Sequence, residues 1–187
     1  GSYSLGADHT GTLTLALPLG NNEWRVAVNA SGDKAFMQAY FDPAVRSSTV
    51  LYKADPAQFS NAGVNGTYTF LLEGANAAGE RVANIGRFTA NGAGSITNGA
   101  LDSNEGGQIS SASFTGSYSV AQNGRAAVTL TIGGRNFGFA MYVVNADMVI
   151  LSANEDTATG VPARMGTAWR QTGGPYSAAS LAGDYVF

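Results

Sequence analysis

Residues 116–134 read GSYSVAQNGRAAVTLTIGG, and this stretch decides the fold class. Apolar residues alternate with small polar ones on both sides of the turn sequence Asn123-Gly124; Val128 and Leu130, for example, are separated by a threonine. Alternation with a period of two is typical of a half-buried β-strand. Two such runs around an Asn-Gly pair predict antiparallel strands joined by a hairpin.

The same pattern extends in both directions, and no segment keeps helical periodicity over a long run. Turn sequences recur about every ten residues, among them Asn91-Gly92, a pair that readily takes positive φ angles at both positions of a type I′ turn. Eight strands are expected, at about residues 68–72, 81–90, 95–102, 109–120, 126–132, 136–144, 148–153 and 163–170.

Eight sequential strands joined by tight turns favour a closed sheet, because an open one leaves two unpaired edges. We therefore expect an all-β fold built as an antiparallel eight-stranded up-and-down barrel. A β-sandwich of the same strands is the alternative that the pattern leaves open. Glycines inside the strands fit bends in a tightly curved wall; these are Gly86, Gly99, Gly116 and Gly138.

The chain contains an internal repeat of about 116 residues. The first five residues, GSYSL, return as GSYSV at residues 116–120, and VNGTYTF at residues 64–70 returns as LAGDYVF at residues 181–187. A unit of this length is close to the commonest domain size. The repeat predicts that the chain is a piece of a tandem array, an arrangement that gives length without new folds.

The phase of the repeat predicts five segments. They are residues 1–54, the second half (strands four to eight) of one barrel; 55–63, a linker; 64–171, a complete barrel; 172–180, a second linker; and 181–187, the first strand of a following or complementing repeat. Phe59 and Tyr176 occupy matching positions in the linkers, where each could pin the linker to a neighbouring barrel.

A half-barrel exposes a sheet edge and half of a core. We expect its missing strands to come from the preceding part of the chain or from another molecule, with residues 181–187 as their natural complement. A second apolar surface is expected on residues 137–144 and 148–151, which are apolar at nearly every position, as in strands covered on both faces. Tyr142, Val144, Val149 and Leu151 are expected to face outward and to be covered by a neighbouring unit or molecule. The predicted assembly interface consists of these four residues together with Leu181, Tyr185 and Phe187.

The composition argues against several classes of partner. Charged residues make up 12% of the chain, the net charge is −3, and Lys34 and Lys53 are the only lysines, so no basic face for nucleic acid is expected. No run approaches the roughly 18 apolar residues of a membrane span, so we expect no membrane insertion. Cysteine is absent, which excludes a disulfide scaffold and thiolate chemistry. The lysine-poor surface, rich in Gly, Ser, Thr and Asn, favours an extracellular or cell-surface location.

Few residues suggest chemistry. His9 is the only histidine and lies in an expected turn, so a zinc site with the usual nitrogen and sulfur ligands cannot form. Asp102, Asn104 and Glu105 loosely resemble a calcium loop, but these residue types also dominate ordinary turns. We expect no catalytic residues and no cofactor, with calcium as the one weak candidate.

The two tryptophans have two interpretations. Trp24 and Trp169 could line a sugar-binding platform, or they could be structural positions, since Trp169 aligns with Tyr52 and Trp24 with Phe137 in the repeat. We favour the structural interpretation.

The run GRFTANGAGSITNGALDSNEGG at residues 86–107, followed by GSYSV at 116–120 and NGR at 123–125, resembles a β-rich repeat. Similar repeats occur in very large secreted or surface proteins of environmental bacteria, where units of this size follow one another. The resemblance implies an extracellular location and many copies, and it implies no catalytic residue.

Together these observations predict a non-enzymatic extracellular structural repeat. It would form a fibre, stalk or surface filament by end-to-end packing or strand complementation, with copies of itself as partners. The alternative is a binding or adhesion module that holds a carbohydrate or a small apolar ligand at the barrel.

Overall fold

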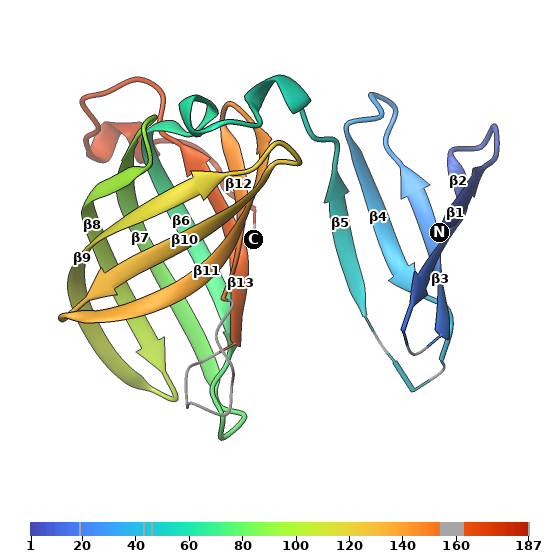
Figure 1. Ribbon diagram of the computed structural model, residues 1–187, viewed down its shortest axis with the longest axis horizontal. Helices are drawn as coiled ribbons and strands as arrows, with labels where there is room; N and C mark the ends of the chain where they lie inside the picture. The colour runs from blue at the N-terminus through green and yellow to red at the C-terminus, as the bar shows by residue number, and fades with distance from the viewer. Residues whose placement is uncertain (19, 43, 46, 154–162, 187) are drawn as a thin grey trace. The chain divides into compact units, whose positions relative to one another are not determined.

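The structure is a computed structural model that describes residues 1–18, 20–42, 44–45, 47–153 and 163–186 (Figure 1). The chain divides into two units, Gly1–Ala54 and Asp55–Phe187. In the described residues the regular structure is almost entirely strand, with three short 3-10 helices: η1 (Pro56–Gln58), η2 (Asn61–Gly63) and η4 (Ala178–Leu181). None of the helices in this part of the chain is long and apolar enough to cross a membrane.

The second unit contains a closed barrel of eight antiparallel strands. Each strand pairs with its neighbours in sequence, and the last pairs with the first, so the predicted up-and-down barrel is confirmed and the sandwich alternative is wrong. The strands are β6 (Asn65–Ala75), β7 (Arg81–Asn91), β8 (Ser95–Glu105), β9 (Gln108–Val120), β10 (Arg125–Ile132), β11 (Arg135–Asn145), β12 (Met148–Ala153) and β13 (Ala163–Arg170).

Glycines set the backbone conformation of several hairpin turns. The two-residue loops Gly106-Gly107 and Gly133-Gly134 have positive φ at both positions, as a type I′ turn requires. Asn91-Gly92 is different, because only Gly92 has a positive φ (+72°) and the side chain of Asn91 accepts hydrogen bonds from the backbone N–H groups of Ala93 and Ser95. The type I′ turn predicted at Asn91-Gly92 is therefore wrong: the asparagine is used as a cap for a longer loop.

The barrel interior is packed with apolar side chains from all eight strands. Three aromatic contacts lie at its centre: the rings of Tyr68 and Phe88 are stacked, and Phe70 contacts both Phe88 and Phe114. The rest of the core comes from inward residues at alternate positions, as expected for strands with one buried face.

One end of the barrel is closed by residues that precede β6. The side chain of Phe59 packs against the core, Val64 is buried, and the side chain of Asn61 accepts a 2.8 Å hydrogen bond from the backbone N–H of Val120. Figure 1 shows η1 and η2 across this end. Residues 55–63, predicted as a linker, therefore form an end plug of the second unit's own barrel, and Phe59 packs on that barrel.

The first unit is an open sheet of five strands in the order β1-β2-β3-β4-β5. Its pairing repeats that of β9–β13: Tyr3 lies opposite Leu13 as Tyr118 lies opposite Val128. The strands are β1 (Ser2–Leu5), β2 (Thr10–Leu17), β3 (Gly20–Val28), β4 (Lys34–Ala39) and β5 (Ser48–Tyr52).

The strand pairing tests the predicted alignment of the two tryptophans. Trp24 lies opposite Ala39 as Phe139 lies opposite Ala153, so the alignment of Trp24 with Phe137 was wrong by two residues. Trp169 lies opposite Met148 as Tyr52 lies opposite Lys34, which agrees with the alignment from the sequence. The pairings therefore match the two sheets residue by residue.

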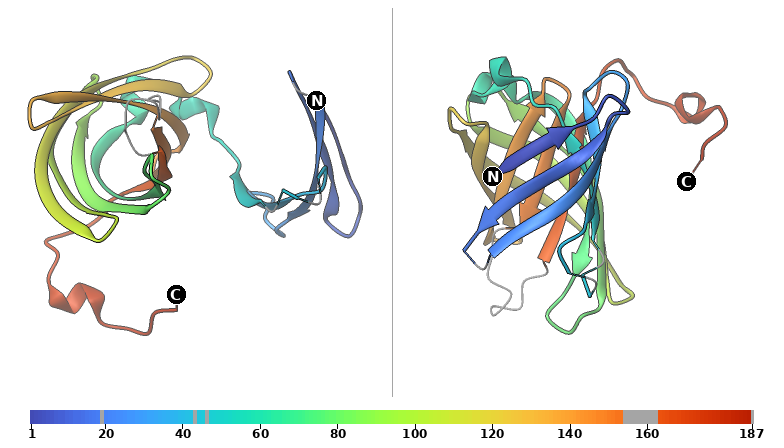
Figure 2. Two further views of the ribbon diagram at one scale, coloured as in Figure 1. Left: turned by 90° about the horizontal axis from the view of Figure 1, so that it is seen from below. Right: turned by 90° about the vertical axis from the view of Figure 1, so that its right-hand side faces the viewer.

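The chain leaves the barrel after β13 and continues through η4 (Figure 2). The predicted first strand at residues 181–187 is not seen in its described part, because Leu181 ends η4 and residues 182–186 are not strand. The physical reason is that a strand needs a neighbour for its backbone hydrogen bonds. Phe187 lies outside the described residues.

Candidate assembly site

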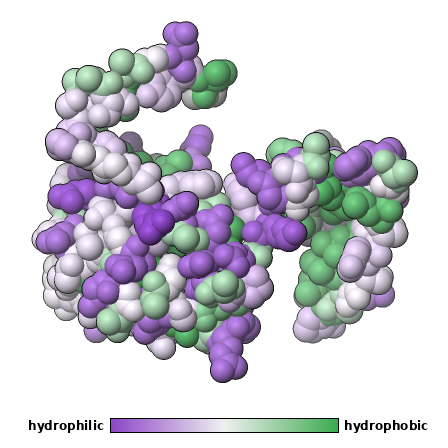
Figure 3. Space-filling model, turned by 90° about the horizontal axis from the view of Figure 1, so that it is seen from above, coloured by the Kyte–Doolittle hydropathy of each residue, from purple (hydrophilic) through white to green (hydrophobic). Residues whose placement is uncertain are grey.

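The inner face of the first unit is the most unusual surface of the protein. In the barrel, the matching face is core: the side chain of Tyr118 is 4% exposed and Ala168 is fully buried. In the open sheet, their counterparts Tyr3 and Leu51 are 85% and 41% exposed. Figure 3 shows apolar surface gathered on the N-terminal unit, at the right of the view. The same strand pairing thus produces a closed core in one unit and, in the other, an inner face that buries Met37 and Ala39 but leaves Tyr3, Leu5 and Leu51 exposed.

The edges of this sheet are open as well. β5 pairs with β4 and β1 pairs with β2, and neither has a second neighbour within the described residues. In the barrel, the strands at the same positions, β13 and β9, each have one: β6 and β8. An open edge presents a row of N–H and C=O groups that can pair with another strand.

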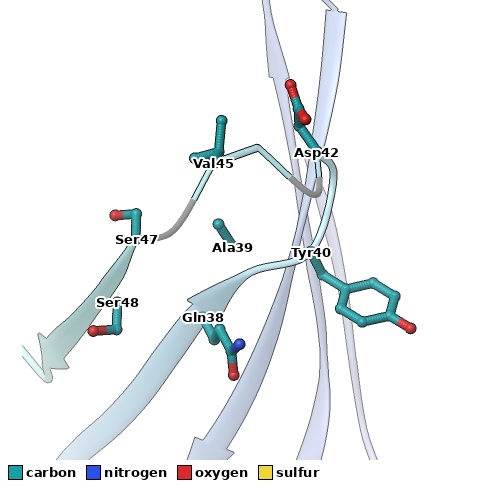
Figure 4. Close-up of a pocket in the computed structure, with 7 residues that line it drawn as sticks. All are labelled: Gln38, Ala39, Tyr40, Asp42, Val45, Ser47 and Ser48. Carbon is teal, nitrogen blue, oxygen red and sulfur yellow. The ribbon is translucent and has the colours of Figure 1, made fainter.

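A groove of about 830 Å³ lies where β4 ends and β5 begins (Figure 4). Ala39 points toward Val45, while the ring of Tyr40 points to the other side, over the guanidinium of Arg25 at 4.3 Å. The one carboxylate in its lining is Asp42, which accepts a 2.8 Å hydrogen bond from the backbone N–H of Ala44. The hydroxyl residues Ser47 and Ser48 also line this groove, which therefore contains residues from both faces of the sheet.

The barrel of the second unit has little internal space. Its cavity measures about 30 Å³ and is lined by apolar side chains, among them Phe70, Phe114 and Leu151. Pockets for small-molecule ligands are usually about 300–1,000 Å³. Among the described residues, the side chains that fill the interior leave a cavity well below this size.

The outward surface predicted on β11 and β12 is largely wrong. Val149 and Leu151 belong to the barrel core, and only Tyr142 is both outward and substantially exposed (44%). In β12 the residues that alternate with the core positions are Met148 and Ile150. An apolar run on both faces gives no period-two signal, so its phase cannot be read from the sequence.

Val144 is buried for a different reason. The pairing of β11 with β12 is irregular between Val143 and Asn145, which places Val144 at a bulge. Its carbonyl oxygen accepts a 2.7 Å hydrogen bond from the backbone N–H of Asp55, and β11 contacts η1. The end plug of the same barrel therefore covers this part of β11, where a neighbouring molecule was predicted.

The C-terminal residues predicted for assembly are exposed. Leu181 is 73% and Tyr185 is 65% exposed, whereas the matching residues of the barrel, Val64 and Tyr68, are buried. The segment thus carries apolar side chains that have a core position in one repeat and none in the other.

The weak calcium candidates lie on a strand and its hairpin. Asp102 and Asn104 are on the outer face of β8, whereas Glu105 is on the inner side. Asp102 accepts a 2.5 Å hydrogen bond from Ser111, and Asn104 accepts one of 3.0 Å from the backbone of Gly107. Among the described residues, no group of three potential metal ligands lies close together.

His9 lies in the turn between β1 and β2 with a φ of +63°.

A polar network inside the barrel was not predicted from the sequence. Asn84 is fully buried, donates to the hydroxyl of Ser103 at 2.7 Å, and accepts from a guanidinium nitrogen of Arg164 at 2.6 Å. The available signal was the alternation Val82, Asn84, Gly86 along β7, which puts Asn84 on the inward face.

No protein-family model matches the sequence, and a search of curated proteins finds no match either.

The end plug of the barrel makes one further buried hydrogen bond, in which the hydroxyl of Tyr118 donates to the carbonyl oxygen of Val64 at 2.7 Å. In the open sheet, Tyr3 takes the place of Tyr118 and is exposed.

Proposed function

We propose that this protein is a non-enzymatic, extracellular structural module whose copies assemble end to end into a fibre, stalk or surface filament. The observation that carries the proposal is the contrast between two matching surfaces. The inner face of β9–β13 is a closed core, and the same face of β1–β5 is open, with Tyr3 85% exposed where Tyr118 is 4% exposed.

The energetics of that face favour association. Burying one large apolar side chain contributes about 1.5–3 kcal/mol, and Tyr3, Leu5 and Leu51 are all more than 40% exposed on the inner side. Pairing the backbone groups of an open edge adds to this gain and also sets the direction of the contact. A partner that supplies strands to the half-barrel would bury these apolar side chains and pair the backbone groups of the open edge.

The repeat explains why such a contact leads to a chain of molecules. The open half-barrel and the barrel-starting C-terminal segment are different surfaces of one molecule, so their contact is heterologous. Heterologous contacts form open filaments unless the rotation between copies closes a ring. The extracellular location is supported by the composition: low charge and only two lysines, Lys34 and Lys53.

The proposal is tested by the concentration dependence of the full chain's size. Sedimentation velocity and negative-stain electron microscopy should show growth into linear polymers as protein concentration rises. Leu51→Ser should raise the protein concentration at which polymers form at least tenfold, because Leu51 faces the open half-core. Phe36→Ser is the matched control, since Phe36 is also exposed but lies on the outer face of β4. A monomer at every concentration, or equal effects of the two substitutions, would contradict the proposal.

A further inference from the structure

The C-terminal segment has the local structure of the segment that starts the barrel. Ser60 and Ser177 both precede a 3-10 helix in an extended conformation, with φ of −158° and −143°. Six residues after each serine a glycine has a positive φ, +129° at Gly66 and +145° at Gly183. At Ser177 and Gly183 the C-terminal segment therefore repeats the backbone conformation of the segment that leads into β6.

In the barrel, this starting segment makes two kinds of contact. The carbonyl of Val64 accepts the 2.7 Å hydrogen bond from Tyr118, and β6 then pairs with β13. In that pairing Thr69 lies opposite Trp169. These contacts close the end of the barrel and satisfy the edge of β13.

The open sheet keeps the receiving half of both contacts. By the register of the two sheets, Tyr3 stands for Tyr118 and Tyr52 stands for Trp169. Tyr3 is exposed, and β5 has no second neighbour among the described strands. Within the described residues, Tyr3 and β5 therefore lack the contacts that Tyr118 and β13 make in the barrel.

We propose that residues 177–186 of one copy dock on β5 of a second copy in the register of β6 on β13. Tyr185 then lies opposite Lys53, Val186 lies opposite Tyr52, and the carbonyl of Leu181 accepts the hydroxyl of Tyr3. This inference rests on the proposed function and names its contact. The docked segment fills one of the three strand positions that distinguish the open sheet from the barrel.

The exposure of the C-terminal segment agrees with this partner. Val186 is fully exposed and Tyr185 is 65% exposed, so docking removes apolar surface from both molecules.

The chain has no cysteine, which makes the register testable by cross-linking. Tyr52→Cys in one tagged sample is mixed with Val186→Cys in another and mildly oxidised. Directly opposite residues of antiparallel strands have Cβ atoms about 4.5–5.5 Å apart, within a small shift of disulfide geometry. We expect a mixed covalent dimer at least tenfold more abundant than from Tyr52→Cys mixed with Tyr185→Cys, where the side chains point to opposite faces.

Three outcomes overturn the docking. Equal yields from both mixtures exclude the register, and absence of the mixed dimer excludes the contact. In a chain that carries both Tyr52→Cys and Val186→Cys, an internal cross-link without a mixed dimer shows that the segment docks in its own chain. Sedimentation of the same samples under reducing conditions separates this inference from the proposed function. If polymers form but the mixed dimer does not, the assembly proposal stands and this docking is wrong.

Discussion

The hydroxyl of Tyr118 donates a 2.7 Å hydrogen bond to the carbonyl oxygen of Val64, which lies 54 residues earlier in the chain. The bond is buried and joins β9 to the residue that immediately precedes β6. It therefore fastens the end plug to the wall of the barrel. Its counterpart in the open sheet, Tyr3, is exposed, and this pair of tyrosines provides an internal comparison within one chain.

Tyr118→Phe should destabilise the barrel by about 1–2 kcal/mol, because it leaves the buried carbonyl of Val64 without this donor. Urea unfolding followed by the fluorescence of Trp169, in a Trp24→Phe background, reports on the barrel alone. Tyr3→Phe, measured in dilute protein, is the control and should leave this transition unchanged. Equal effects of the two substitutions would show that the bond to Val64 does not stabilise the plug.

The buried tyrosines also predict an alkaline limit to stability. Burial raises the pKa of both Tyr68 and Tyr118 above the usual value of about 10. A raised pKa means that the folded barrel holds these protons more tightly than the unfolded chain does. Their contribution is fully present below pH 10 and is lost as the pH rises above it.

Urea midpoints measured between pH 8 and pH 11.5 should therefore fall steeply only above about pH 10. In Tyr118→Phe the decline should be shallower, because one of the two titrating groups is absent. A midpoint that is independent of pH across this range would contradict the burial of both phenols.

The barrel was predictable from the sequence because its signal is local and repeated. Alternation in a strand such as β10 (Arg125–Ile132) and the two-glycine turns each act over a few residues, and closure follows from eight such units in order. The repeat then extended the same strand pattern to residues 1–54. These steps need no knowledge of distant contacts.

The errors arise where the answer depends on distant contacts. Residues 55–63 are short and polar with one proline, which is also the composition of a linker, and only the closed barrel end shows that Phe59 has a core to fill. In β12, Val149 and Ile150 are equally apolar, so the inward phase is set by pairing with β11 and β13. A bulge at Val144 is likewise invisible in the sequence.

Gly99 is expected to tolerate no side chain. It lies on the inner face of β8 beside an irregularity in the pairing with β9, and a Cβ atom there would contact the ring of Phe114 and approach its carbonyl oxygen to 2.5 Å. Gly99→Ala should cost about 1–3 kcal/mol of unfolding free energy through overpacking. Ala100→Ser, on the exposed face next to it, should change stability by less than about 0.5 kcal/mol. A neutral Gly99→Ala would mean that Phe114 can move aside.

The buried Asn84 predicts a stability change that depends on its partner. Asn84→Leu keeps the approximate volume but removes the acceptor for Arg164 and the donor to Ser103, bonds of 2.6 Å and 2.7 Å. Hydrogen bonds to charged groups contribute about 1.5–3 kcal/mol, so we expect a loss of about 2–3 kcal/mol in urea unfolding of the barrel.

The double variant Asn84→Leu/Arg164→Met should be more stable than Asn84→Leu alone. Asn84 is buried and Arg164 is half-buried. Replacing both polar side chains with apolar ones removes the cost of partly desolvating the charge, whereas removing one partner leaves that cost in place. The comparison therefore measures the coupling between the two side chains, independently of how well leucine packs. If the double variant is as unstable as the sum of the two single variants, Asn84 and Arg164 act separately, and the network does not organise this part of the barrel.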